Sequence, residues 1–95
     1  MTVPPLIFRV HAIERMFQRG ISQDDVRSVL EGGQVTEEYP EDQPYPSRLI
    51  LGWCGSRPLH VVPSDDSNTH ETIIIAVYEP DPAKWEAGFS RRRKT

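Results

Sequence analysis

The sequence predicts an α+β domain, in which an N-terminal two-helix hairpin packs on a small, mainly antiparallel β-sheet of three to four strands. Two observations carry this prediction. Apolar residues recur at helical spacing in the first third of the chain, and short runs rich in β-branched residues follow from residue 35. The length of 95 residues fits one domain with one core.

The first helix is expected from Arg9 to Arg19, after an entry segment (residues 1–7) in which two prolines prevent helix formation. Gly20 ends it, as glycine commonly does just past a helix C-terminus. Apolar residues three and four positions apart predict the buried face of this helix. That face is expected to contain Val10, Ala12, Ile13, Met16 and Phe17.

The second helix follows a three-residue elbow. Ser22 is a natural N-cap, and Asp25 stands at the capping-box position three residues later. Three apolar residues, Val26, Val29 and Leu30, form the expected inner stripe. A pair of glycines at 32–33 ends the helix.

The second half of the chain predicts strands at residues 35–39, 48–54, 59–63 and 71–78. The segment 35–39 is short and is expected at a sheet edge, whereas 71–78 is the most apolar and is expected near the centre. Residues 40–47 contain three prolines and are expected to form a loop. A single domain over residues 8–87 follows, with a basic, disordered tail at 88–95 that lacks an apolar partner.

The formal net charge of −3 is unevenly distributed. The tail residues 91–94 are all basic, which leaves seven basic against fourteen acidic side chains in the rest of the chain. An acidic domain argues against general nucleic-acid binding by the folded core, although the tail could supply attraction.

Cys54 is the only cysteine, so no internal disulfide can form, and a reducing cytoplasm is the expected location. The longest apolar run, residues 73–77, is too short to span a bilayer, so no membrane partner is expected. Neither metal-ligand spacing nor a glycine-rich phosphate loop is present, and no metal or cofactor is expected.

The first candidate site is a polar row on the first helix, formed by His11, Arg15 and Arg19 at intervals of four residues. A histidine can move a proton near neutral pH, and guanidinium groups can hold a phosphate and stabilise charge that develops on it. The same spacing is also that of the solvated face of an amphipathic helix. Spacing alone does not decide between these two interpretations.

Two further candidates lie in the strands. Tyr78, at the end of the most apolar strand, can hydrogen-bond to a ligand or stack on a base, or it can be an aromatic residue at the margin of the core. His60 alternates with Leu59 and Val61 and therefore points away from their face of the sheet. It is a second candidate proton carrier, or a packed or surface histidine.

Four sequence motifs occur in an order that resembles one known family. They are His11-Ala12-x-x-Arg15, Arg19-Gly20-Ile21-Ser22, Arg57-Pro58-Leu59-His60-Val61-Val62, and Ala76-Val77-Tyr78-Glu79-Pro80-Asp81-Pro82-x-x-Trp85. Together they resemble the family catalogued as domain of unknown function 4258, over about residues 8 to 86.

The resemblance implies a relation to RelE-like and MqsR-like toxins, within the wider fold that barnase and colicin nucleases share. It implies an endoribonuclease toxin of a type II toxin–antitoxin pair, which cleaves RNA, free or on the ribosome, without a metal. The expected partner is a small zinc-finger antitoxin of the YgiT/MqsA type.

The resemblance also implies roles for individual residues. His11 would be a general acid or base, and His60 a second proton carrier. Arg15 and Arg19 would neutralise the phosphate, with Arg57 as a further substrate-binding residue, and Tyr78 would position a base or phosphate. These roles would make catalytic residues of His11, Arg15, His60 and Tyr78.

Two other classes of function remain open from the sequence. The chain could be a non-catalytic protein-interaction module of the same fold, which docks a partner at the sheet edge 35–39 or at the acidic loop. It could also be a small structural subunit that forms a homodimer. The sequence leaves the oligomeric state undetermined.

Overall fold

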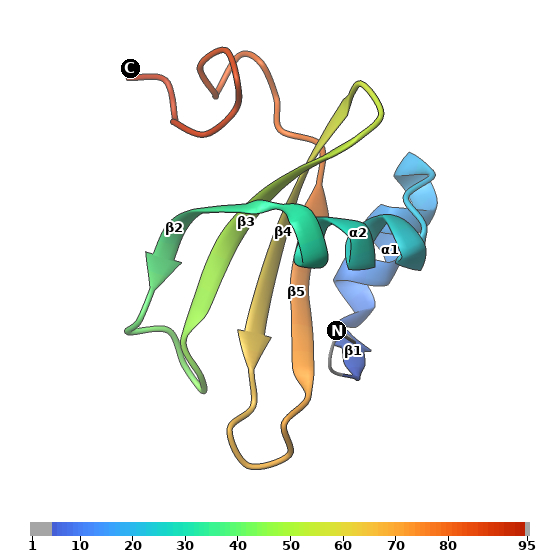
Figure 1. Ribbon diagram of the computed structural model, residues 1–95, viewed down its shortest axis with the longest axis vertical. Helices are drawn as coiled ribbons and strands as arrows, with labels where there is room; N and C mark the ends of the chain where they lie inside the picture. The colour runs from blue at the N-terminus through green and yellow to red at the C-terminus, as the bar shows by residue number, and fades with distance from the viewer. Residues whose placement is uncertain (1–4, 95) are drawn as a thin grey trace.

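The computed structural model describes residues 5–94 and has an α+β fold with two helices and one five-stranded mixed sheet (Figure 1). The elements in chain order are β1 (Leu6–Phe8), α1 (Val10–Arg19), α2 (Gln23–Gly32), β2 (Gln34–Tyr39), β3 (Ser47–Cys54), β4 (Arg57–Asp65) and β5 (Thr72–Tyr78). The α+β class is confirmed, and each of the four expected strands is present with ends shifted by at most two residues.

The sheet has the order β1-β5-β4-β3-β2, so the edge position expected for β2 is confirmed. The expectation of three to four strands missed β1, which pairs in parallel with β5 through the register Leu6↔Thr72 and Phe8↔Ile74. The other pairings are antiparallel. A three-residue strand is too short to show an alternation of apolar and polar residues. Most of β1 lies in residues 1–7, which the sequence predicted as an entry segment without regular structure. Residues 1–4 of that segment are outside the described residues.

The second helix covers the sheet as the sequence predicts. Ser22 and Asp25 form a complete capping box, with the Asp25 backbone N–H donating to Ser22 Oγ at 3.0 Å and the Ser22 N–H to Asp25 Oδ2 at 2.9 Å. Val26 and Val29 are buried. Val29 lies directly over Gly52 of β3, where any β-carbon would come within 2.6 Å of it. The absence of a side chain at Gly52 therefore lets α2 pack closer to β3 than any larger residue at that position would allow.

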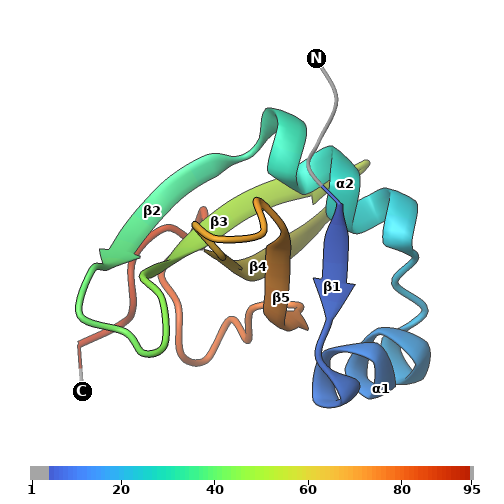
Figure 2. The ribbon, with the colours of Figure 1, turned by 90° about the horizontal axis from the view of Figure 1, so that it is seen from below.

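The first helix is rotated relative to the prediction and presents only one side of its predicted apolar face to the sheet. Ala12 and Met16 are buried against β5, whereas Val10, Ile13 and Phe17 are 68%, 49% and 88% exposed. Helix α1 lies at the border of the sheet beside β1 and β5, so it contacts only a narrow strip (Figure 2). The small side chain of Ala12 permits close approach there, and this rotation brings the polar row of the helix next to β5.

The two faces of the sheet are covered by different parts of the chain (Figure 2). The face under the helices contains the main core, with Ile50, Leu59, Val61, Ile74 and Val77. The opposite face contains His60 and is covered by the segment after β5, whose Trp85 is 3% exposed. Trp85 therefore closes over buried residues on this second face.

The basic tail differs from the expected disordered segment. Residues 84–93, called the C-terminal segment below, fold back on themselves: the Glu86 N–H donates to the Arg91 carbonyl and the Arg93 N–H to the Lys84 carbonyl, each at 2.8 Å. Phe89 contacts the exposed ring of Trp53 on β3, with ring centroids 6.0 Å apart. Trp53 is the apolar partner that the sequence did not reveal, and residue 95 lies outside the described residues.

Candidate functional site

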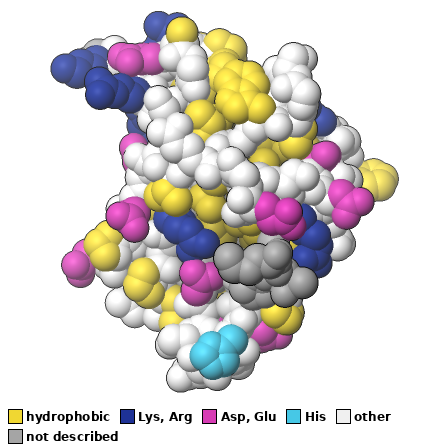
Figure 3. Space-filling view, viewed as in Figure 1, with side chains coloured by type: hydrophobic (Ala, Val, Ile, Leu, Met, Phe, Trp, Pro, Cys, Tyr) yellow, Lys and Arg dark blue, Asp and Glu magenta, His cyan; other side chains and the backbone are white. Residues whose placement is uncertain are grey.

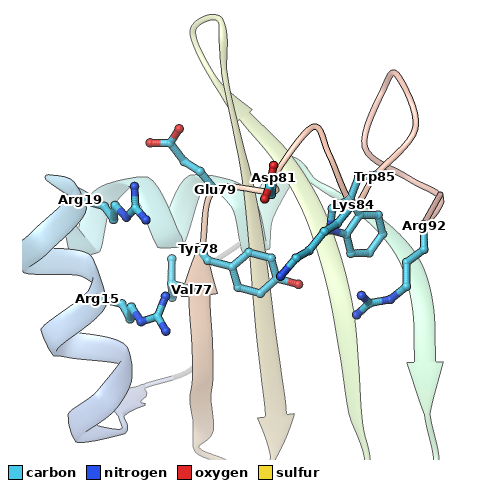
Figure 4. A pocket seen from close by; sticks show the side chains of 9 residues that line it. All are labelled: Arg15, Arg19, Val77, Tyr78, Glu79, Asp81, Lys84, Trp85 and Arg92. Carbon is cyan, nitrogen blue, oxygen red and sulfur yellow. The ribbon is translucent and has the colours of Figure 1, made fainter. Parts of the chain in front are cut away.

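A cleft of about 340 Å³ lies between α1 and the C-terminal segment, at the end of β5. Its lining residues are Arg15, Arg19, Val77, Tyr78, Glu79, Asp81, Lys84, Trp85 and Arg92. Figure 4 shows Arg15 and Arg19 reaching from α1 towards Tyr78, with Lys84 and Arg92 on the other side. The Arg92 guanidinium lies 4.7 Å from the centroid of the Trp85 ring, which holds this cation at the wall of the cleft.

A second cleft of about 230 Å³ adjoins the first and brings His11, Arg15 and Tyr78 together. Its floor is β5, where the register with β4 shifts so that Val62 pairs with Ala76 and Pro63 with Ile74. Ile75 is consequently an extra residue on β5. Such bulges redirect side chains and are frequent beside functional sites.

The two clefts belong to a longer groove along α1 and β5. They share Arg15 and Tyr78, and a third cleft of about 340 Å³, which includes Arg9 and the loop residues 42–45, shares His11 with the second. His11, Arg15 and Arg19 follow one another at intervals of about 6 Å along the helix axis. The groove therefore carries a regular row of nitrogen donors along one wall.

The groove is more basic than the rest of the protein. Five cationic and three anionic residues line the three clefts. The remaining residues include six basic and eleven acidic ones, so the acidic balance of the chain lies outside the groove. Figure 3 shows further basic side chains gathered over the C-terminal segment at the upper left. An anionic ligand would meet a locally attractive surface on a protein that is acidic as a whole.

His60 is completely buried beneath the cleft. Its Nε2 lies 2.8 Å from the Phe89 carbonyl oxygen and its Nδ1 lies 3.3 Å from the Tyr78 hydroxyl. The rings of Trp85 and Tyr78 pack against the imidazole edge-to-face, with centroids 4.4 and 5.2 Å away. His60 therefore contacts Tyr78 and is separated from solvent, whereas His11 is exposed in the groove.

Burial lowers the pKa of His60 below its ordinary value of 6.5, because the charged imidazolium is disfavoured away from water. The unfolded chain therefore binds a proton that the folded chain resists, so stability is lost as the pH falls below about 6.5. We expect a slope of up to about 1.4 kcal/mol per pH unit in the free energy of unfolding. Urea unfolding at pH 7.5, 6.5 and 5.5 measures it.

The matched variant for this prediction is His60→Gln, which retains a donor and an acceptor but does not titrate. Its unfolding free energy should vary less with pH over this range than that of the unaltered protein. His11 and His70 are present in both proteins, so their contributions cancel in the comparison. Equal slopes in the two proteins would show that His60 does not resist protonation in the folded state.

Arg57 connects β4 to the end of α1. Its Nε donates to Glu79 Oε1 at 2.6 Å, and its two terminal nitrogens donate to the carbonyls of Gly20 and Arg19. These bonds occupy the guanidinium group at the C-terminal end of the helix, where positive charge is favourable. The structure thus places Arg57 behind the groove as a tether that holds α1, and outside the lining residues.

Sequence reasoning missed three basic residues of the groove, Arg9, Lys84 and Arg92. For Arg92, the basic composition of the tail was the one sequence feature that could have indicated a role in binding an anion. It did not give a position, because the contact with Trp85 is set by the turn at Gly88 and Phe89, whose φ angles are 91° and 62°. No sequence pattern distinguishes Lys84 or Arg9 from the basic residues outside the groove.

Two features are absent from residues 5–94. No group of three or more His, Cys, Asp or Glu side chains there is arranged to hold a metal ion. Neither helix in this range is long and apolar enough to cross a membrane.

Comparison with known proteins identifies one relationship. The family model for domain of unknown function 4258 (DUF4258) matches residues 8–79, which is about three quarters of the chain. No curated protein and no solved structure matches. The match spans both helices and extends through β5, and it includes His11, Arg15 and Tyr78 of the groove. The chain belongs to the DUF4258 family.

Proposed function

We propose that this protein is an endoribonuclease toxin of a type II toxin–antitoxin pair, which cleaves RNA without a metal through attack by the ribose 2′-hydroxyl. One observation carries the proposal: a proton-transfer group, a phosphate-binding group and a tyrosine, namely His11, Arg15 and Tyr78, line one open cleft. Proton transfer and electrostatic stabilisation are the two contributions that this reaction requires from a protein.

In the proposed reaction the 2′-oxygen forms a bond to the adjacent phosphorus and the bond from phosphorus to the 5′-oxygen breaks. The 2′-hydroxyl loses its proton and the departing 5′-oxygen gains one. His11 transfers one of these protons as general acid or base, and solvent exchanges the other. Arg15 and Arg19 neutralise the charge on the phosphate oxygens, and Tyr78 positions the nucleotide. The products are a 2′,3′-cyclic phosphate and a 5′-hydroxyl end.

The charge and shape of the groove support a single-stranded substrate. His11, Arg15 and Arg19 recur at about 6 Å along the axis of α1, an interval comparable to the spacing of successive phosphates in an extended strand. The half-buried Tyr78 adds aromatic surface beside this row. A basic groove with aromatic side chains is the usual arrangement for binding single-stranded nucleic acid.

The proposal includes a relation to RelE-like and MqsR-like toxins and to their barnase-like fold. It also includes a zinc-finger antitoxin of the YgiT/MqsA type as the neutralising partner, and cytoplasmic RNA, free or ribosome-bound, as the target. The five-stranded sheet under two helices is compatible with this relation. Function on such a fold depends on the site residues, so the experiment below addresses them directly.

The proposed function is tested by mapping RNA ends in cells after brief induction of the protein without an antitoxin. New 5′-hydroxyl ends are expected with the unaltered protein. With His11→Ala they should fall by at least about 100-fold, since general acid–base catalysis contributes that much or more. Cells are the appropriate medium because ribosome-dependent cleavage does not occur on purified RNA.

His70→Asn is the matched control for this experiment. His70 is also an exposed histidine, but it lies in the β4–β5 loop with a φ of 60°, which asparagine tolerates. The control should leave the new ends unchanged. Soluble protein that produces no new ends would refute the proposed ribonuclease and favour the alternative below.

The alternative is a non-catalytic protein-interaction module of the same fold. The free edge of β2 favours it, because an edge strand offers unpaired backbone groups to an extended segment of a partner. Val35 on this strand is 46% exposed. A Val35→Pro variant should abolish partner binding under this alternative, whereas His11→Ala should leave binding intact.

A further inference from the structure

The buried hydrogen bonds of His60 define which ring nitrogen carries its proton. A carbonyl oxygen can only accept, so the 2.8 Å contact to the Phe89 carbonyl requires a hydrogen on Nε2. A neutral imidazole has one N–H, and Nδ1 is then an acceptor. The complete burial of the ring favours this neutral form.

The Tyr78 hydroxyl must therefore donate its hydrogen to His60 Nδ1, across 3.3 Å. Its oxygen retains lone pairs that can accept a hydrogen bond from another direction. Tyr78 is half-buried and lines both the first and the second cleft. Figure 4 shows its ring extending across the cleft towards the C-terminal segment.

The C-terminal segment sets this arrangement through a tight turn. Gly88 and Phe89 both have positive φ, and the turn is fixed by the backbone bond from the Phe89 N–H to the Glu86 carbonyl at 2.9 Å. The Phe89 ring rests on Trp53. A phenylalanine in the left-handed region is uncommon, and such residues cluster at functional sites. All of these residues except Trp53 lie beyond residue 79, where the family match ends.

We propose that the Phe89 carbonyl and His60 hold Tyr78 as a hydrogen-bond acceptor in the cleft, which makes the C-terminal segment a working part of the site. His60 is a positioning residue, since it acts through Tyr78 and does not reach the cleft. The acceptor would bind a hydroxyl or N–H donor of the ligand. The identity of the ligand as RNA rests on the proposed function. The hydrogen bonds that join the Phe89 carbonyl, His60 and Tyr78 do not depend on it.

Charged groups around His60 must be compatible with its neutral form. The positive charge of Arg92, from the C-terminal segment, disfavours a second proton on the His60 ring. The negative charge of Glu37, from β2, favours it. Tyr78, from β5, is a further titratable neighbour, and its own pKa is raised by burial. Burial has the largest influence on His60 and opposes the charge. The neutral imidazole is thus the expected form at pH 7.5.

The test is a two-bond ¹H–¹⁵N NMR spectrum of the histidine rings in the full-length protein at pH 7.5. His60 should be a single tautomer, with an unprotonated Nδ1 and a protonated Nε2. A protonated Nδ1, or a ring protonated on both nitrogens, would overturn the proposal. The measurement requires no RNA, so an absence of cleavage with the expected tautomer would refute the ribonuclease and leave this arrangement standing.

Two substitutions at Phe89 separate its backbone from its side chain. Phe89→Gly accepts the positive φ and retains the carbonyl, so it should preserve the Nε2–H tautomer. Phe89→Pro fixes φ near −65° and removes the N–H that bonds to Glu86, so the carbonyl must move and His60 should become a mixture of tautomers. A single unchanged tautomer in Phe89→Pro would show that the segment does not set it.

Discussion

Replacement of Arg15 by glutamine is expected to lower the number of new RNA 5′-hydroxyl ends by about 100-fold or more. Arg15 lines both the first and the second cleft, between His11 and Arg19, and is the guanidinium best placed to meet a phosphate beside His11 and Tyr78. Loss of one preorganised charge-stabilising donor typically costs 100-fold or more in rate. Glutamine retains a donor and the helical propensity but removes the charge.

Arg27→Gln is the control for Arg15→Gln. Arg27 lies on α2, outside the residues that line the three clefts, so the same chemical change should leave RNA cleavage unaltered. Equal melting temperatures of the two variants would exclude a folding defect. If both variants produced as many ends as the unaltered protein, Arg15 would have no part in cleavage, and the groove would need another phosphate-binding group.

Replacement of Gly33 by alanine is expected to produce the largest loss of stability from a single methyl group. An added β-carbon would collide with the Val29 carbonyl oxygen and would lie 2.8 Å from the Leu51 carbonyl oxygen. Both are backbone atoms, in α2 and β3, and neither can move without separating the helix from the sheet. Overpacking of this kind costs about 1–3 kcal/mol, and we expect the upper end of that range. Thermal unfolding should show a fall of more than about 10 °C.

Gly32→Ala provides a matched comparison at the neighbouring residue. A β-carbon on Gly32 would meet no atom within 4 Å, and this residue is the last of α2. Alanine is favoured over glycine in a helix by about 0.5–1 kcal/mol, so this variant should be as stable as the unaltered protein or slightly more so. A similar melting temperature for the two variants would contradict the close contact between α2 and β3 at Gly33.

The local features that the sequence predicted depend on neighbours in the chain. The capping box of Ser22 and Asp25 and the end of α1 at Gly20 both form as expected, because each is completed by backbone groups within four residues. The four expected strands are present for the same reason. Alternation and turn residues are properties of short segments.

The candidate site was predicted in part. Spacing placed His11, Arg15 and Arg19 in one row, and the structure places that row in a groove with Tyr78. The sequence could not decide whether the row faced solvent or a groove. Its apolar pattern predicted a wider buried face that included Val10, Ile13 and Phe17 beside Ala12 and Met16. Those three side chains are exposed.

The sequence by itself determined the α+β class, the helix boundaries and the chemical identity of the polar row, since these follow from local propensity and periodicity. Only the tertiary structure decided the rotation of α1, the parallel pairing of β1 with β5, and the return of the C-terminal segment onto His60. Each of these depends on contacts between residues distant in sequence. The Phe89 carbonyl and the His60 ring are 29 positions apart, and no local pattern records that they meet.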